Sequence, residues 1–327
     1  MVGKVAVEEH FVTPELADTI FGSIGWDKSA WRQMRDLLLE TDELRLAEMD
    51  RHGIEMAVLS LAAPCLQDLP PDRDATRAAA AANEALAEIV ARRPDRYAAL
   101  AALALQDPET AAAELTRAVR ELGMKGALVN GFTTSSAPGS GGARYYDEEA
   151  YLPFWAVVEE LGVPLYLHPR NPLEAERRMY RGREELLGPT WAFTVETATH
   201  ALRLITSGLF DRFPKLTVVL GHMGELLPFA IERTEQRLSR IEGAGLRRGP
   251  SQVLRENFFL TTSGNFHTQS LVGAILQVGA ERMLFAVDYP FERTHEAAEW
   301  FDAAPIGETN RRMIGRTNAI ELFGLPL

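Results

Sequence analysis

Several polar side chains in this sequence end short aliphatic runs. Glu8 and His10 follow "VAV" near the start of the chain, His168 ends "VPLYLHP", and Asp288 ends "RMLFAVDYPF". Burying such groups is costly unless a partner neutralises them. Imidazole nitrogens and carboxylate oxygens form a hard to borderline ligand set that suits Zn²⁺ or Mn²⁺. We therefore expect a divalent metal site built from groups of this kind.

A fourth run, "LTVVLGHMGE", ends in His222 and has Glu225 three residues later. Taken singly, each of these groups is equally well explained as a strand-end cap, a helix N-cap or a surface pair. Their joint occurrence at strand ends favours a common site. By contrast, Glu196 and His200 lie four residues apart, as on one helical face, and predict a surface or interface pair.

The spacing of Glu8 and His10 places them on one side of a strand. Side chains alternate in direction along a strand, so Glu8 and His10 share a face with Ala6, whereas Val5 and Val7 lie on the other face. Bulky valines suit a helix-facing surface. We therefore expect Val5 and Val7 to face outward, with Glu8 and His10 directed into the mouth of the fold.

Aliphatic runs alternate with amphipathic stretches of helical length, which indicates parallel strands joined by helices. The predicted strands cover residues 4–10, 55–61, 97–103, 125–130, 164–168, 216–222, 257–263 and 282–288. Such a series most simply closes into an α/β (β/α)8 TIM barrel. A doubly wound open sheet is the alternative, but it usually has a glycine-rich turn after its first strand, and "EEHFVTPE" has none.

Three segments exceed the repeat: 22–42, 131–146 and 169–189, after the first, fourth and fifth strands. All three follow the carboxyl end of a strand, which is where barrels build active sites. The tail from 307 predicts one or two closing helices. Nothing resembles a linker, so we expect residues 1–327 to form one domain.

The composition argues against some classes of binding partner. The net charge of −12 argues against nucleic acid and anionic membrane partners. No apolar run reaches the ~20 residues that a membrane span needs. Cys65 is the single cysteine, so no internal disulfide can form, and we expect a cytoplasmic protein.

The order of motifs resembles the amidohydrolase superfamily, and within it the ortho-hydroxybenzoate decarboxylases, above all the γ-resorcylate (2,6-dihydroxybenzoate) enzymes. The resemblance runs nearly end to end. The stretches that carry it are "EEH", "LVNGF", "YLHPRNP", "LLGPTWAF", "ETATHALRL", "SGLFDRFPKL", "GHMGE", "TTSGNF" and "DYPFE". One departure is Tyr289, where this branch is expected to have Trp.

The resemblance implies one divalent metal ion, Zn²⁺ or Mn²⁺. Its ligands would be Glu8, His10, His168 and Asp288. Many hydrolytic relatives have His-x-His on the first strand and a metal-bridging lysine at the end of the fourth. Here those positions hold Glu8 and Asn130, which favours one metal over two.

For catalysis, the resemblance implies that Asp288 protonates the ring and that His222, supported by Glu225, lies beside the substrate. Arg233 is implied as a substrate contact, in its own or a neighbouring subunit. We also expect Trp191 and Phe291 to wall an aromatic ring.

The expected activity is the non-oxidative, in principle reversible, decarboxylation of a small aromatic acid by a homodimer or homotetramer. Two alternatives remain open: a metal-dependent lactone or amide hydrolase, and a non-catalytic barrel used for binding.

Overall fold

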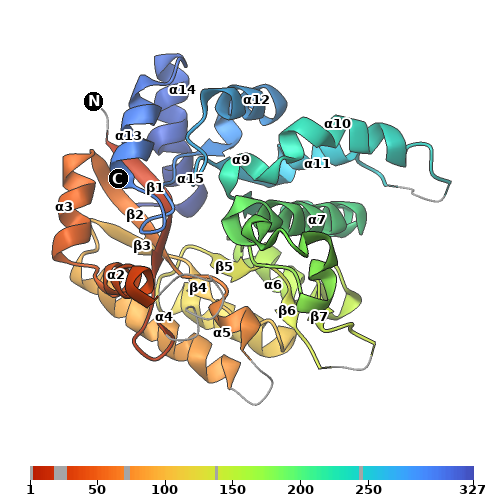
Figure 1. Ribbon diagram of the computed structural model, residues 1–327, viewed down its shortest axis with the longest axis horizontal. Helices are drawn as coiled ribbons and strands as arrows, with labels where there is room; N and C mark the ends of the chain where they lie inside the picture. The colour runs from red at the N-terminus through yellow and green to blue at the C-terminus, as the bar shows by residue number, and fades with distance from the viewer. Residues whose placement is uncertain (1–2, 18–27, 70–73, 137–138, 243–245) are drawn as a thin grey trace.

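The strands form a closed parallel barrel. In a computed structural model, the described part of the chain comprises residues 3–17, 28–69, 74–136, 139–242 and 246–327 (Figure 1). The barrel strands are β1 (Lys4–Phe11), β2 (Ile54–Leu61), β3 (Tyr97–Ala99), β4 (Ala101–Ala102), β5 (Ala127–Asn130), β8 (Leu165–His168), β9 (Val218–Leu220), β10 (Phe258–Thr261) and β11 (Met283–Leu284). The pairings run β1-β2-β3 and β4-β5-β8-β9-β10-β11, all parallel.

Backbone hydrogen bonds join these two sheets into a ring. β3 and β4 are one strand, and the Leu100 N–H between them donates to Leu59 O at 2.9 Å. At the other seam, β1 pairs with the chain that continues β11: the Val7 N–H donates to Phe285 O at 3.2 Å, and the His10 N–H donates to Tyr289 O at 2.7 Å. The prediction of a (β/α)8 barrel is confirmed.

Helices surround the barrel, and most begin and end where the sequence indicates. Asp74 caps α4 by accepting the Arg77 N–H, and Gly162, at φ 64°, ends α6. The helices are α2 (Lys28–Leu39), α3 (Glu43–Arg51), α4 (Ala75–Arg92), α5 (Pro108–Arg120), α6 (Leu152–Leu161), α7 (Ala192–Thr206), α8 (Leu209–Arg212), α9 (His222–Glu225), α10 (Leu227–Leu238), α11 (Pro250–Asn257), α12 (Thr268–Val278), α13 (Thr294–Ala303), α14 (Glu308–Arg312) and α15 (Asn318–Phe323). None of the helices in the described ranges is both long and apolar enough to cross a bilayer.

Two apolar clusters make up the core. The larger one joins the outer faces of the strands to the surrounding helices. The smaller one fills the barrel interior with alternate residues from each strand, such as Met56, Leu128 and Val219. Ala319 and Phe323 of α15 belong to this inner cluster, so the predicted closing helix covers one end of the barrel, beside β1 (Figure 1).

The outward placement predicted for Val5 and Val7 is wrong, because both belong to the inner cluster. The reason is a β-bulge. Ala6 pairs with Ala57 and Glu9 with Leu59, so β1 has one more residue than β2 between these pairs. The extra residue lets Val7 and Glu8 both face inward.

The three predicted insertions lie after β1, β5 and β8. Most of 22–42 is occupied by α2, while residues 22–27 lie outside the described residues. The segment 131–146 contains an antiparallel pair, β6 (Thr133–Thr134) with β7 (Ala143–Arg144). The segment 169–189 forms short 3₁₀ turns, η3 (Glu174–Tyr180), η4 (Glu184–Leu186) and η5 (Gly188–Thr190). The last segment contributes to the pocket described below.

Candidate metal centre and its pocket

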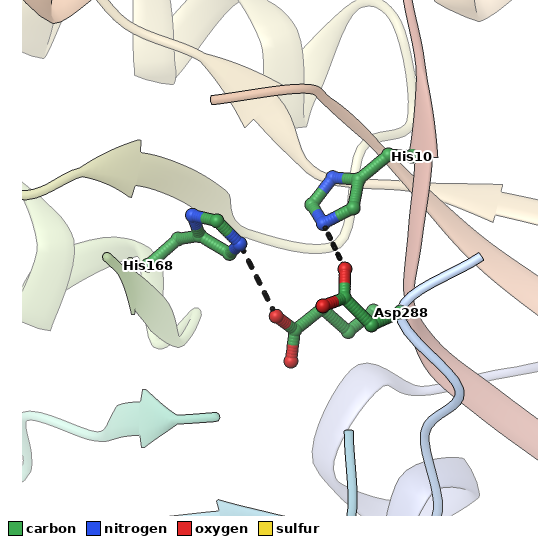
Figure 2. A group of neighbouring side chains, drawn as sticks. His10, His168 and Asp288 are labelled. Carbon is green, nitrogen blue, oxygen red and sulfur yellow. Dashed lines mark ion pairs between the residues drawn. The ribbon is translucent and has the colours of Figure 1, made fainter. Parts of the chain in front are cut away.

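The structure brings Glu8, His10, His168 and Asp288 together at the carboxyl end of the barrel. One ligand-capable atom from each lies within 4.8 Å of the others. His10 Nε2 is 3.0 Å from Asp288 Oδ1, and His168 Nε2 is 3.3 Å from Glu8 Oε1. Figure 2 shows the rings of His10 and His168 directed at these carboxylates from different parts of the barrel.

The atoms that face one another in this cluster have no hydrogen bonds. Glu8 Oε1, His10 Nε2 and Asp288 Oδ1 are all buried, and none of these atoms has a hydrogen-bond partner. Buried polar atoms are otherwise nearly always satisfied. A divalent cation would satisfy all of them at once, so the residues present fit a metal ion.

Neighbouring groups turn both imidazoles toward this centre. His168 Nδ1 lies 3.0 Å from Pro169 O, a contact that requires an N–H at Nδ1 and leaves the lone pair on Nε2. His10 Nδ1 lies 3.3 Å from the Ser60 hydroxyl. Such contacts fix the ring orientation and tautomer of metal-binding histidines.

The second carboxylate oxygen of Glu8 is held from the barrel interior. Tyr166 and Thr261 both donate a hydroxyl hydrogen bond to Glu8 Oε2, the latter at 3.3 Å. Burial opposes ionisation of Glu8, but the fields of His222, His168 and His10 outweigh it. The pKa of Glu8 therefore lies well below its ordinary value, and Glu8 is an anion.

His222 and Glu225 form a buried pair next to this centre. His222 Nδ1 is 2.7 Å from Glu225 Oε1, and His222 Nε2 is 3.6 Å from Asp288 Oδ2. Burial alone would lower the pKa of His222, but the charges of Glu225 and Glu8 raise it well above 6.5. Burial would raise the pKa of Asp288, but the neighbouring imidazoles of His10 and His222, at 3.0 and 3.6 Å, lower it. The directions of these two shifts favour a proton on His222 and not on Asp288.

Backbone strain accompanies this pair. His222, Met223, Glu225 and Asp288 all have positive φ, between 51° and 80°. L residues rarely adopt this region, and such strain clusters at functional sites. Glycine provides room nearby: a Cβ on Gly264 would lie 3.0 Å from the His222 ring.

A cavity of about 380 Å³ opens onto the centre. His168, His222 and Asp288 line its base, and Phe193 and Phe291 supply aromatic walls. Phe291 also packs against the His10 ring, with centroids 5.5 Å apart. The volume and the apolar walls suit a small aromatic ligand.

Two predicted site residues lie elsewhere. Trp191 is 46% exposed and is absent from the described residues that line the pocket. It precedes α7, whose second residue, Phe193, faces the pocket instead. Arg233 lies on the exposed surface of α10 and does not reach the pocket of its own chain.

The prediction of Glu196 and His200 as a surface or interface pair is corrected, because both side chains lie inside the chain. Both residues are buried, because the β6–β7 segment covers α7. Tyr145 donates a hydroxyl hydrogen bond to Glu196 at 2.5 Å, and the Tyr146 N–H donates to His200 Nε2 at 3.2 Å.

Sequence reasoning missed several residues that shape the site. Tyr166 precedes His168 by two positions, so strand alternation alone could have placed it on the same face. Arg170, on the pocket wall, donates to Phe132 O at 2.7 Å and pairs with Asp68, and it thereby ties three loops together. No local pattern signals Phe193 or Arg170.

Comparison with known proteins agrees with this geometry. The amidohydrolase family profile matches residues 10–325. The chain is 50% identical to γ-resorcylate decarboxylase from Rhodococcus jostii, over 99% of both chains.

Among solved structures, 2,6-dihydroxybenzoate decarboxylase complexed with 2,6-dihydroxybenzoate has a TM-score of 0.95 and 49% identity, covering 99% of this chain and 100% of that one. Dihydroxybenzoic acid decarboxylase from Polaromonas sp. JS666, with bound manganese and the inhibitor 2-nitroresorcinol, has a TM-score of 0.94 and 48% identity, covering 100% and 98%. The resemblance noted from the motifs is confirmed. The chain belongs to the amidohydrolase family.

Proposed function

We propose that this protein is a metal-dependent decarboxylase of an ortho-hydroxybenzoate, with 2,6-dihydroxybenzoate as the first substrate to test. The observation that carries the proposal is the convergence of Glu8, His10, His168 and Asp288 on one centre, next to an aromatic-walled pocket that His168 and Asp288 also line. The full-length similarity to γ-resorcylate decarboxylases supports it.

The proposed metal ligands are these four residues. Manganese is the first choice over zinc, because related structures carry manganese. When bound, the ion would supply Lewis-acid chemistry and a template that orients the carboxylate and ortho oxygen of the substrate. Two imidazoles and two carboxylates give a set that is neutral overall with a divalent ion.

Asp288 and His222 would move the proton. Decarboxylation requires a proton at the ring carbon that bears the carboxylate; the carbon–carbon bond then breaks, CO₂ leaves, and its bonding electrons restore the aromatic ring. His222 Nε2 lies 3.6 Å from Asp288 Oδ2, so a shift of a few tenths of an ångström would bring the two to hydrogen-bond distance, where a proton held on the imidazole could pass to the carboxylate. Glu225 holds the other ring nitrogen and stabilises the protonated imidazole. General acid catalysis of this kind contributes roughly 10²–10⁴-fold.

The ring would lie against Phe291 and Phe193. We further propose a homodimer or homotetramer in which Arg233 contacts the substrate of a neighbouring subunit. Exposed apolar side chains support self-association near Arg233: Phe229 on the same helix, and Val272 and Leu276 on α12. A cytoplasmic location accords with the single cysteine.

The test is direct. The manganese-loaded protein is incubated with 2,6-dihydroxybenzoate, and resorcinol and CO₂ are measured; 3,5-dihydroxybenzoate, which lacks an ortho hydroxyl, is the matched control. We expect turnover of the first compound only. Hydrolysis of lactones or amides without CO₂ release would contradict the proposal, and so would loading below ~0.1 metal ion per chain.

A further inference from the structure

A buried arginine lies next to the metal centre and is not among the described residues that line the pocket. Arg45 of α3 is 2% exposed. Its Nη2 donates to the main-chain oxygen of His10 at 2.6 Å and to that of Leu37 at 3.3 Å. Its guanidinium carbon lies 4.7 Å from the ring centroid of Tyr289. Arg45 thus contacts one proposed ligand and the residue that follows another.

This arginine is costly to bury. No ion pair in the described ranges includes it, and its Nε and Nη1 are buried without a hydrogen bond. A buried cation without a paired carboxylate costs stability, because its desolvation is not repaid. Its contacts with His10 and Tyr289 therefore point to another role.

Those contacts meet at the seam that closes the barrel. Beyond the end of β11, hydrogen bonds join this segment to β1 at four points in the described residues. Besides the Val7–Phe285 and His10–Tyr289 bonds, the Val287 N–H donates to Glu9 Oε1 at 3.1 Å and the Asp288 N–H donates to Glu8 O at 2.9 Å. Three of the four proposed ligands, Glu8, His10 and Asp288, belong to this seam. Asp288 moreover has φ 80°, a conformation that its surroundings must enforce.

We infer that Arg45 is a positioning residue for the metal centre: it sets the separation of His10 and Asp288 by holding the main chain of one and the neighbour of the other. The inference rests on the proposed function and deepens it. Groups that orient metal ligands typically change metal affinity by roughly 10–100-fold when removed. The planar guanidinium provides a flat face for the Tyr289 ring in addition to its donors, and a lysine ammonium has no such face.

The test measures Mn²⁺ affinity, with free ion quantified by electron paramagnetic resonance, in the full-length protein. We expect Arg45→Met to bind Mn²⁺ about 10–100-fold more weakly. We expect Arg45→Lys, which keeps a charged donor toward His10, to recover part of that loss. Arg51→Met is the control, since Arg51 is on the same helix but its side chain is 64% exposed; it should match the parent.

A purely structural role would give a different result. It would lower the free energy of unfolding of the metal-free protein but leave the affinity of the folded fraction, and the spectrum of its bound Mn²⁺, unchanged. An Arg45→Met affinity within twofold of the parent overturns the inference. Should that variant not fold, Arg45→Gln is measured against the same criterion. A parent that binds no Mn²⁺ would overturn the proposed function as well.

Discussion

Replacing Gly221 with alanine should damage the metal centre through a single methyl group. Gly221 follows β9 with φ −69° and ψ −178°, a conformation that alanine adopts without strain. A Cβ at this position would lie 3.0 Å from Glu8 Oε2, 3.1 Å from Ser263 Oγ and 3.3 Å from the Tyr166 hydroxyl. The substitution therefore tests side-chain space, separately from backbone conformation.

The size of the effect follows from these contacts. At 3.0–3.3 Å the neighbouring atoms must move by a few tenths of an ångström. They cannot move independently, because Tyr166 and Thr261 hydrogen-bond the Glu8 carboxylate. Overpacking of this kind costs roughly 1–3 kcal/mol of stability. Metal–ligand distances tolerate shifts of only about 0.2 Å, so we expect Mn²⁺ affinity to fall at least about tenfold, or ~1.4 kcal/mol.

Two measurements check this prediction. Urea unfolding of the metal-free protein gives the loss of stability, and Mn²⁺ titration gives the affinity. Gly307→Ala is the matched control, since Gly307 has φ −61° and a Cβ there would meet no atom within 4 Å. If Gly221→Ala binds Mn²⁺ as tightly as the parent, the contact between this Cβ and Glu8 does not determine the position of Glu8 as a metal ligand.

Three further predictions concern stability at low pH, stabilisation by Mn²⁺ and the activity of the Asp288→Asn variant. Burial lowers the pKa of His200 to about 3, from 6.5, so the stability it contributes is intact above pH 6.5 and declines toward pH 3. Between pH 7.5 and 5 His200 should contribute a loss of about 2 kcal/mol, measured by urea unfolding as the difference between the parent and His200→Gln, which keeps an acceptor for Tyr146. The comparison is needed because burial raises the pKa of Glu9 to about 8, which changes stability in the opposite direction in both proteins. Equal pH dependence of the two proteins contradicts the reasoning. Mn²⁺ at 100 times its Kd should add about 2.7 kcal/mol of stability, and an unchanged Tm after chelation argues against the site. Asp288→Asn should abolish resorcinol formation but weaken Mn²⁺ binding only in part; full activity would exclude Asp288 as the proton donor.

The order of strands and helices was predictable from the chain alone. Each strand is a run of aliphatic residues, such as "TVVL" before Gly221 or "LYL" before His168, and each crossover helix is an amphipathic or alanine-rich stretch. These are local properties, so their periodicity is visible in one sequence. The polar groups at the strand ends were visible for the same reason.

The faces of β1 were not predictable. Alternation assigns Val7 and Glu8 to opposite sides, but the bulge between Ala6 and Glu9 directs both inward. The bulge is a property of the pairing between β1 and β2, and no pattern within β1 reveals it.

The residue that forms the aromatic wall of the pocket was not predictable either. Trp191 and Phe193 are equally plausible in sequence, and the start of α7 decides which one faces the pocket.

The sequence by itself determined the number and order of the barrel elements and the chemical types of the groups at their ends, because hydrophobic period and residue identity are local. Only the tertiary structure decided that Glu8, His10, His168 and Asp288 share one centre, that His222 is paired with Glu225 beside it, and that Arg45 holds the seam next to it. Those relations depend on closing the barrel between β1 and the segment after β11, residues separated by nearly the whole chain. Packing sets the distances across that seam, and no single stretch of residues determines that packing.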